Sequence, residues 1–113
     1  MHLPELRVNC TCVRVPVMRS HSISAAVYTR DSISVSAAKR AIGDFSGDIL
    51  YDAPEAEIYP MPIVAEGKND VYVGRVRRAL DSPRGISLWC SGDQIRKGAA
   101  ANAVQIAEYI CRK

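Results

Sequence analysis

The sequence lacks most features that mark a membrane protein, a secreted protein or a common enzyme class. It has no run of about 18 apolar residues, which argues against a transmembrane helix. The first residues, MHLPELR, carry no apolar segment, so no secretory signal is expected. A Gly-x-Ser-x-Gly nucleophile elbow is absent, as is a glycine-rich phosphate loop after a strand. These absences favour a cytoplasmic protein with no membrane partner.

Cysteine is present, but not in a recognised metal or disulfide pattern. Paired zinc ligands commonly have about two to four residues between them, and the two histidines do not complete such a site. Without a secretory signal, a disulfide framework is not expected either. We therefore predict no metal site and four reduced thiols, mostly buried as small hydrophobic residues: Cys10, Cys12, Cys90 and Cys111. If one of the four were a nucleophile it would be Cys12, which lies two residues from Arg14.

Aromatic residues are also scarce, at 6% of the chain, and they form no run among the basic residues. Proteins that bind single-stranded nucleic acid usually stack bases on aromatic side chains, so no nucleic-acid partner is expected. The net charge of +3 is only a mild indication of an anionic ligand. What the chain does have is 113 residues, 48% of them hydrophobic, which is enough for one small folded domain and excludes a disordered segment.

Local patterns predict the order β-β-α-β-β-β-α, an α+β (mixed α/β) fold with a mixed sheet. Alternating residues predict the first two strands, with Val13, Val15 and Val17 on one face of the first. Ser34 is expected to cap a helix that ends near Gly43. The predicted strands are 7–17, 22–30, 47–52, 71–80 and 86–92, with a loop at 53–70, a turn at 82–85 and a final helix at 94–111 capped by Asp93.

The final helix combines an apolar face with a run of small residues. Ile95, Ala99, Ile106 and Ile110 recur at helical spacing. The small run at 98–101 would let another backbone or a flat ligand come close. Two cations in the first turn, Arg96 and Lys97, would form an anion site beside free N–H groups, unless they are solvated or paired with a carboxylate.

Arg14 and His21 are the strongest candidates for chemistry. An arginine grips a carboxylate or phosphate with two parallel hydrogen bonds. A histidine has a pKa near neutrality, which suits a general acid or base. From composition alone, a structural or surface role for each remains the alternative.

Three longer strings resemble the aspartate-semialdehyde dehydrogenase family, and they occur in the family's order and spacing. They are TCVRVPVMRSHS at residues 11–22, YPMPIVAEGKNDVYVGRVRR at 59–78 and SGDQIRKGAAANAVQIAE at 91–108. The third string resembles plant-like and some bacterial members, so a plastid location would apply if the source were a plant or alga. On this resemblance, the chain is identified as the C-terminal part, about the last third, of a member.

The resemblance implies reduction of L-4-aspartyl phosphate to L-aspartate 4-semialdehyde by NADPH, in lysine, threonine and methionine biosynthesis. In the family, a cysteine forms an acyl-enzyme that hydride resolves. By residue match, Arg14 would bind the substrate's α-carboxylate, and His21 would be the catalytic acid/base. Gln94 would contact the NADP cofactor at the start of the last helix. The corresponding region of the family also builds much of the homodimer contact.

The resemblance does not extend to the family's dinucleotide-binding domain or to its catalytic cysteine, and none of the four cysteines occupies that position. We therefore expect the 113 residues alone to have no dehydrogenase activity and not to bind NADP. Residues 1–93 would belong to the catalytic/dimerisation domain, and 94–113 would be a helix returning toward the cofactor domain. The alternative is a non-catalytic dimerisation module. Either way, we expect an apolar patch on the last helix or the sheet face, covered by self-association.

Overall fold

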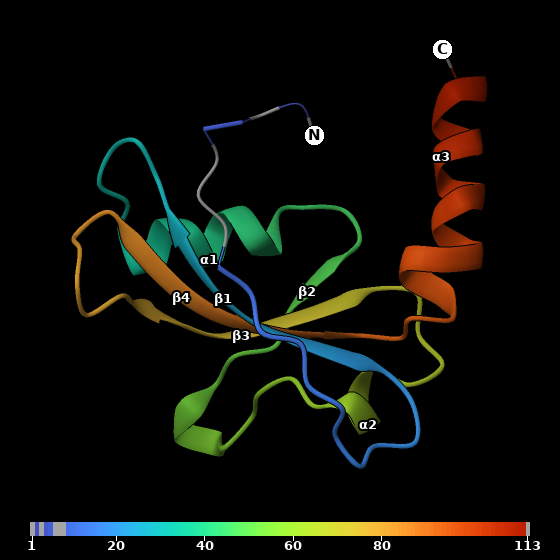
Figure 1. Cartoon of the computed structure of the whole chain (residues 1–113), viewed down its shortest axis with the longest axis horizontal. Coiled ribbons are helices and arrows are strands. Elements are labelled where there is room, and N and C mark those ends of the chain that lie inside the picture. Colours follow the sequence, from blue (N-terminus) through green and yellow to red (C-terminus); the bar gives the residue numbers. More distant parts are fainter. Residues whose placement is uncertain (1, 3, 6–8, 113) are drawn as a thin grey trace.

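In the computed structural model, the chain folds into a four-stranded mixed sheet with a helix across one face (Figure 1). The structure describes residues 2, 4–5 and 9–112. The elements are β1 (His21–Tyr28), α1 (Val35–Gly43), β2 (Asp48–Leu50), α2 (Pro62–Ala65), β3 (Val71–Arg78), β4 (Gly85–Gly92) and α3 (Ala101–Cys111). The strand order is β1-β4-β3-β2; β4 runs antiparallel to both of its neighbours, and β2 runs parallel to β3. The predicted α+β class is confirmed.

Helix α1 and the β3–β4 hairpin form where local signals place them. The Ser34 hydroxyl accepts a hydrogen bond from the Ala37 N–H at 3.1 Å, which satisfies one of the free donors at the helix start. The helix ends at Gly43, as predicted. The hairpin closes through the predicted turn, where the Gly85 N–H donates to the Ser82 carbonyl at 3.1 Å. These elements were predictable because caps, turns and alternation are properties of neighbouring residues.

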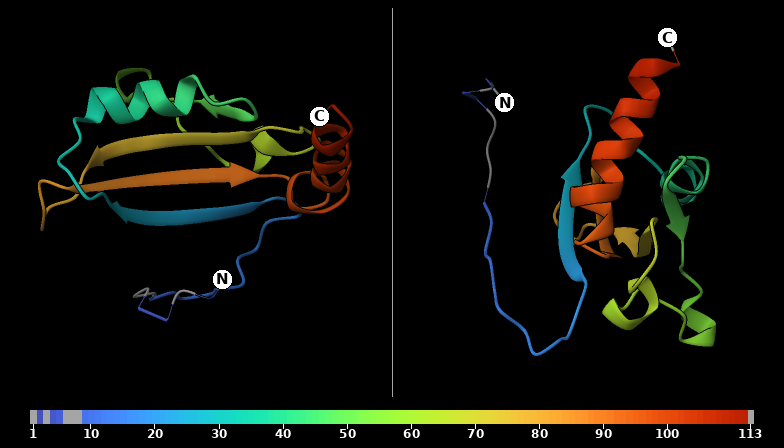
Figure 2. Two further views of the ribbon diagram at one scale, coloured as in Figure 1. Left: turned by 90° about the horizontal axis from the view of Figure 1, so that it is seen from above. Right: turned by 90° about the vertical axis from the view of Figure 1, so that its right-hand side faces the viewer.

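The core lies between α1 and the β3–β4 part of the sheet. It is built around Ala38, Val73, Val76 and Ile86. The register also places Ile23 and Val27 of β1 on this face, opposite Cys90 and Ile86. They remain 60% and 46% exposed, because α1 covers only the part of this face formed by β2 and β3 (Figure 2). The β1 edge of this face is therefore apolar and uncovered.

A β-bulge in β3 shapes the opposite face of the sheet. The register shifts between Gly74 and Arg77, and Arg75 adopts a left-handed φ of 55°. Asp52 holds the bulge: its carboxylate accepts the Arg75 N–H at 2.8 Å and the Val76 N–H at 3.2 Å, and it pairs with Lys39 at 2.8 Å. Burial alone raises the pKa of a carboxyl, but these bonds outweigh it, so the Asp52 pKa lies below its ordinary value.

The first predicted strand is wrong over the part that the structure describes. Residues 9–17 are irregular and exposed, while residues 7 and 8 lie outside the described residues. The Val17 N–H donates to the Val15 carbonyl at 2.8 Å, which bends the chain at Pro16. A strand needs a neighbouring strand to accept its hydrogen bonds, and Figure 2 shows this segment passing β1 without joining the sheet. The predicted order therefore loses its first strand.

The cysteine prediction was only partly right. All four cysteines are free, but Cys10, Cys12 and Cys111 are exposed rather than buried. Two of them lie in the irregular N-terminal segment, so the loss of the predicted strand also removes their expected burial. Only Cys90, on the core face of β4, is partly covered, and burial raises the pKa of its thiol.

The predicted continuous helix over 94–111 is also wrong, because it is interrupted. Lys97, Gly98 and Ala99 have non-helical backbone angles, with φ of 101° at Gly98, and the regular helix begins only at Ala101. Glycine adopts this left-handed conformation without the steric cost of a side chain. Ile95 therefore leaves the predicted apolar face. The expected patch on the last helix is nevertheless present, since Val104, Ile106 and Ile110 are each more than half exposed.

Of the two alternatives for Arg96 and Lys97, the structure does not support the anion site. The Arg96 and Lys97 N–H groups both donate to the Asp93 carbonyl, at 3.0 and 2.9 Å, so they are not available to a ligand. Their side chains contact neutral amides instead. Arg96 donates to Asn69 Oδ1 at 3.0 Å, and Lys97 donates to Gln105 Oε1 at 2.7 Å.

Candidate functional site

His21 is the first residue of β1, at the end of the sheet where β4 finishes. Its partner across the antiparallel ladder is Gly92, the last residue of β4. The chain therefore enters β1 and leaves β4 at the same place, and the residues on either side of these two strand ends are brought together. His21 is exposed, so its imidazole is accessible from solvent.

Gln94 reaches across to the residue that precedes His21. Its Oε1 accepts a hydrogen bond from the Ser20 N–H at 2.8 Å, between residues 74 apart in the chain. Two of the three residues predicted from the sequence, His21 and Gln94, are thus neighbours in space. Ser20 itself is buried and has a φ of 78°, a left-handed conformation that side chains other than glycine rarely adopt.

Asp93 lies beside Gln94 and is completely buried. Its Oδ2 pairs with Arg19 at 2.7 Å and accepts the Gly67 N–H at 2.7 Å, while its Oδ1 accepts the Ile95 N–H at 3.0 Å. Burial by itself raises the pKa of this carboxyl, but the Arg19 guanidinium and the two N–H groups outweigh it. The pKa of Asp93 therefore lies below its ordinary value, and the group is ionised at neutral pH.

Arg14 is not joined to the other two predicted residues. It lies in the exposed segment before β1, seven residues from His21. Among the described residues, no hydrogen bond or ion pair restrains its guanidinium. The arrangement therefore places an acid/base candidate and an amide together on a rigid sheet end, with the arginine on a segment that the sheet does not hold.

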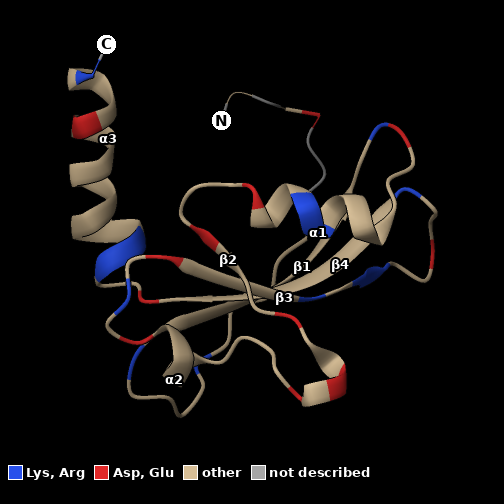
Figure 3. Ribbon diagram, turned by 180° about the vertical axis from the view of Figure 1, so that it is seen from behind, with Lys and Arg blue, Asp and Glu red and all other residues tan. Residues whose placement is uncertain are grey.

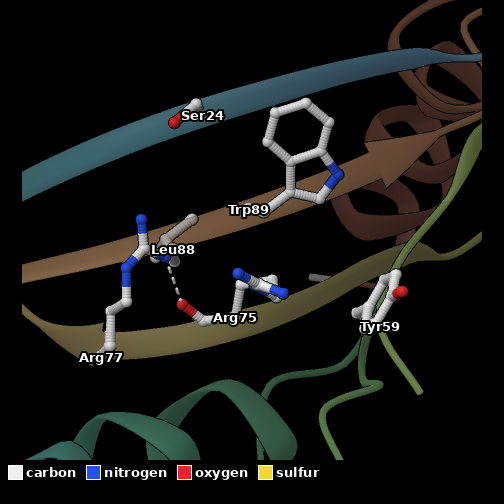
Figure 4. A pocket seen from close by; sticks show the side chains of 6 residues that line it. All are labelled: Ser24, Tyr59, Arg75, Arg77, Leu88 and Trp89. Carbon is white, nitrogen blue, oxygen red and sulfur yellow. Dashed lines mark hydrogen bonds between the residues drawn. The ribbon is translucent and has the colours of Figure 1, made fainter. Parts of the chain in front are cut away.

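A hollow lies on the sheet face opposite α1 (Figure 4). It has a volume of about 270 Å³, and we call it the arginine pocket. Its lining residues are Ser24, Tyr59, Arg75, Arg77, Leu88 and Trp89. The Arg75 guanidinium sits over the Tyr59 ring at 5.5 Å, and Arg77 Nη1 donates to the Arg75 carbonyl at 2.8 Å. Two cations beside two aromatic rings suit a planar or carboxylate-bearing partner.

The described residues do not by themselves fit a dinucleotide or a metal ion. The connection from β1 to α1 contains no glycine, so it cannot form the glycine-rich turn that cradles a pyrophosphate. Within the described part of the chain, no group of three or more His, Cys, Asp or Glu side chains could hold a metal.

None of the described helices is long and apolar enough to cross a membrane. Charges of both signs are interspersed around the loops (Figure 3).

Sequence reasoning missed the residues that connect these features. Asp93 was predicted only as a helix cap; it does accept the Ile95 N–H, but its main partners are Arg19 and Gly67. Nothing in the local sequence marks a pair 74 residues apart in the chain. The arginine pocket was likewise missed, although a glycine within a predicted strand, followed by Arg75 and Arg77, is a signal for a bulge.

Comparison with known proteins identifies the class of the domain. A family model described as the semialdehyde dehydrogenase dimerisation domain matches residues 1–97. The chain therefore belongs to the semialdehyde dehydrogenase dimerisation-domain family. The resemblance to aspartate-semialdehyde dehydrogenases that the sequence motifs indicated is confirmed.

Relatives of known name agree with this assignment. The chain is 44% identical to the aspartate-semialdehyde dehydrogenase of Aquifex aeolicus over 113 residues, which is 100% of this chain and 33% of that protein. It is 47% identical to the Bacillus subtilis enzyme over 111 residues, or 97% of this chain and 32% of that protein. The chain thus spans about a third of the length of these relatives.

A solved structure gives the same result for the fold. Aspartate semialdehyde dehydrogenase II of Vibrio cholerae, complexed with ASA, superposes with a TM-score of 0.83 at 40% sequence identity. The match covers 91% of this chain and 30% of that one. The mixed sheet and its helices are therefore also the fold of the matching part of the Vibrio cholerae enzyme.

Proposed function

We propose that these 113 residues form the C-terminal part of an NADP-dependent aspartate-semialdehyde dehydrogenase. The proposed reaction converts L-4-aspartyl phosphate and NADPH to L-aspartate 4-semialdehyde, phosphate and NADP. The observation that carries the proposal is the meeting of His21 and Gln94 at one end of the sheet. Family membership supports it, because both residues lie in strings that match the family's motifs.

In this proposal, each site residue has one task. Arg14 binds the α-carboxylate of the substrate through the two-point grip of a guanidinium. His21 acts as the acid/base: it takes a proton from the nucleophile and returns one to the reacting oxygen. Its place at a strand end suits this task, because a histidine on a rigid element keeps the same position relative to bound substrate.

The cofactor and the nucleophile would come from the two-thirds of the enzyme that these residues do not cover. Residues 1–93 are proposed as part of the catalytic/dimerisation domain, and 94–113 as a segment whose helix α3 packs on the NADP-binding domain, with Gln94 at the contact. The exposed apolar side chains of α3 support this, since the helix projects beyond the end of the sheet at which β4 finishes (Figure 1).

We predict that the chain alone gives no NADPH-coupled turnover and that a chimera restores it. The chimera joins the N-terminal two-thirds of the Bacillus subtilis enzyme to this chain at the homologous boundary. It is expected to turn over aspartate semialdehyde within about tenfold of its parent, because this chain is 47% identical to the part of the parent that it replaces. The measurement is NADPH formation in the presence of aspartate semialdehyde, phosphate and NADP.

Two results would contradict the proposal. One is a chimera that melts cooperatively at the parent's temperature yet has no turnover. The other is activity of the purified 113-residue chain above an enzyme-free background, since without a nucleophile the covalent route is unavailable. The parent's N-terminal part alone is the matched control, and it should also be inactive.

We also propose that the chain forms a homodimer through the arginine pocket face. The name of the family's domain supports self-association. Of the two sheet faces, one is already packed against α1, whereas the other presents Trp89, Tyr59 and two arginines. Aromatic residues and arginine are enriched in interfaces, because they bury large areas and still hydrogen-bond.

The expected result is a light-scattering mass of about twice the 12.4 kDa of one chain. Trp89→Ala should shift the mass toward the monomer, because it removes the largest side chain of the pocket. The matched control is Ile106→Ala, on the exposed side of α3, which should leave the dimer intact. A wild-type chain that is a monomer at 100 μM would contradict the dimer, and an effect of Ile106→Ala alone would contradict its location.

A further inference from the structure

The residues that follow β4 bind the residues that precede β1. Asp93 pairs with Arg19 at 2.7 Å, and Gln94 accepts the Ser20 N–H at 2.8 Å. The next residue along is His21, which is paired through the ladder with Gly92. Three successive positions before and at the start of β1 are therefore bound to three successive positions at the end of β4.

The same carboxylate also fixes two other backbones. Asp93 accepts the Gly67 N–H at 2.7 Å, from the loop after α2, and the Ile95 N–H at 3.0 Å, from the turn that leads toward α3. Gly67 has a φ of 73°, so it presents its N–H from a left-handed turn. One buried charge thus joins the loop before β1, the loop after α2 and the start of the C-terminal segment.

This arrangement is a costly way to gain stability. Asp93 is completely buried while Arg19 stays partly exposed, and the attraction of the pair is offset by the cost of removing the carboxylate from water. Ser20 is held at a left-handed φ of 78°, and strain of this kind tends to gather at functional sites. Among the described residues, Ser20 Oγ and Arg19 Nε are buried without a partner. All of these costs lie within two residues of His21.

We propose that Asp93 is a positioning residue for His21, acting through Arg19 and the Ser20 backbone. Its ion pair with Arg19 restrains the backbone at Ser20, and this restraint fixes the orientation of the His21 imidazole at the end of β1. It also connects that orientation to the position of Gln94. Asp93 is completely buried and does not touch a substrate; it acts on the reaction only through its neighbours. This inference rests on the acid/base role proposed for His21.

The first test is made on the 113-residue chain by NMR, without reference to activity. In Asp93→Asn, the Gly67 amide should exchange with solvent at least about tenfold faster, because an asparagine side chain accepts a weaker hydrogen bond than the carboxylate does. The Ser20 amide, which donates to Gln94, should also exchange faster, because Arg19 is no longer held by the charge of Asp93. The His21 ring should change from one set of signals to an averaged set with mixed side-chain rotamers. Asp31→Asn, at an exposed aspartate in the loop after β1, is the matched control and should leave both unchanged.

The second test is kinetic and uses the chimera. Asp93→Asn should lower kcat by about 10- to 100-fold, with KM for aspartate semialdehyde changed less than about twofold, since a small displacement of a catalytic group reduces the rate more than binding. A loss of folded protein alone would lower the active fraction without altering the kcat of active sites counted by titration.

A pair of Arg19 variants covers the case in which Asp93→Asn does not fold. The Arg19 side chain is 31% exposed, so its replacement is better tolerated. Arg19→Lys keeps the charge and should recover part of the kcat and of the single His21 ring state that Arg19→Ala loses. A folded Asp93→Asn chain with fast-exchanging amides but unchanged His21 signals and kcat would overturn the proposal. Failure of the acid/base role itself would show separately, as full activity of His21→Ala.

Discussion

His21→Ala in the chimera is expected to lower kcat by about 10²- to 10⁴-fold, the range for removing a general acid/base. The imidazole is an exposed titratable side chain at the strand end where β1 and β4 meet, and Gln94 is its neighbour through Ser20. Alanine leaves a β-strand residue whose backbone still pairs with Gly92, so the fold should be retained. The measurement is steady-state turnover of aspartate semialdehyde, with the melting curve recorded for each variant.

Two comparisons separate this loss from general damage. His2→Ala removes the chain's other histidine and should leave kcat unchanged. Arg14→Lys should instead raise the KM for aspartate semialdehyde by about tenfold, with a smaller effect on kcat. The reason is the loss of one charge-assisted hydrogen bond to the substrate's α-carboxylate, worth about 1.5 kcal/mol. If His21→Ala and His2→Ala gave the same rate, His21 would be an ordinary surface histidine and the proposed site would be wrong.

Gly74→Ala is expected to destabilise the chain by about 3 kcal/mol, the upper part of the range for overpacking a core. A Cβ at this position would lie 2.4 Å from the Tyr51 carbonyl oxygen and 2.6 Å from Pro60 Cδ. The obstruction is backbone on one side and a rigid ring on the other, so it cannot be relieved by rotating a side chain. The measurement is the free energy of unfolding from urea titration.

Gly43→Ala is the matched control for this substitution. A Cβ at Gly43 would meet nothing closer than Leu50 Cβ at 3.9 Å, so the change should be neutral or slightly stabilising. The contrast matters for function as well, because Gly74 lets the Tyr59–Pro60 segment lie against the sheet and brings the Tyr59 ring under Arg75. A Gly74→Ala chain within 1 kcal/mol of wild type would mean that this segment is free to move away.

The two wrong element predictions have the same physical origin. Residues 9–17 have the alternation of a strand, and residues 94–111 have the composition of a helix. A strand exists only where another strand accepts its hydrogen bonds, and no described strand lies beside residues 9–17. In the second case, the Asp93 carbonyl accepts the Arg96 and Lys97 N–H groups and so forms a single turn. The left-handed backbone of Gly98 then separates this turn from the regular helix. Local pattern states what a segment is able to form, whereas the tertiary structure determines whether it forms.

The sequence by itself determined the features that depend on neighbours along the chain. These are the α+β class, the cap and end of α1, the β3–β4 hairpin, and the family, which follows from three long strings. It also led to the prediction, through the resemblance, of Arg14, His21 and Gln94 as site residues, although it assigned Gln94 no partner within the chain. Only the tertiary structure brought Gln94 to Ser20 and Asp93 to Arg19, because each contact joins residues 74 apart. No local signal encodes such a pair: it arises when β1 and β4 align in one register, and that alignment depends on the packing of the whole sheet.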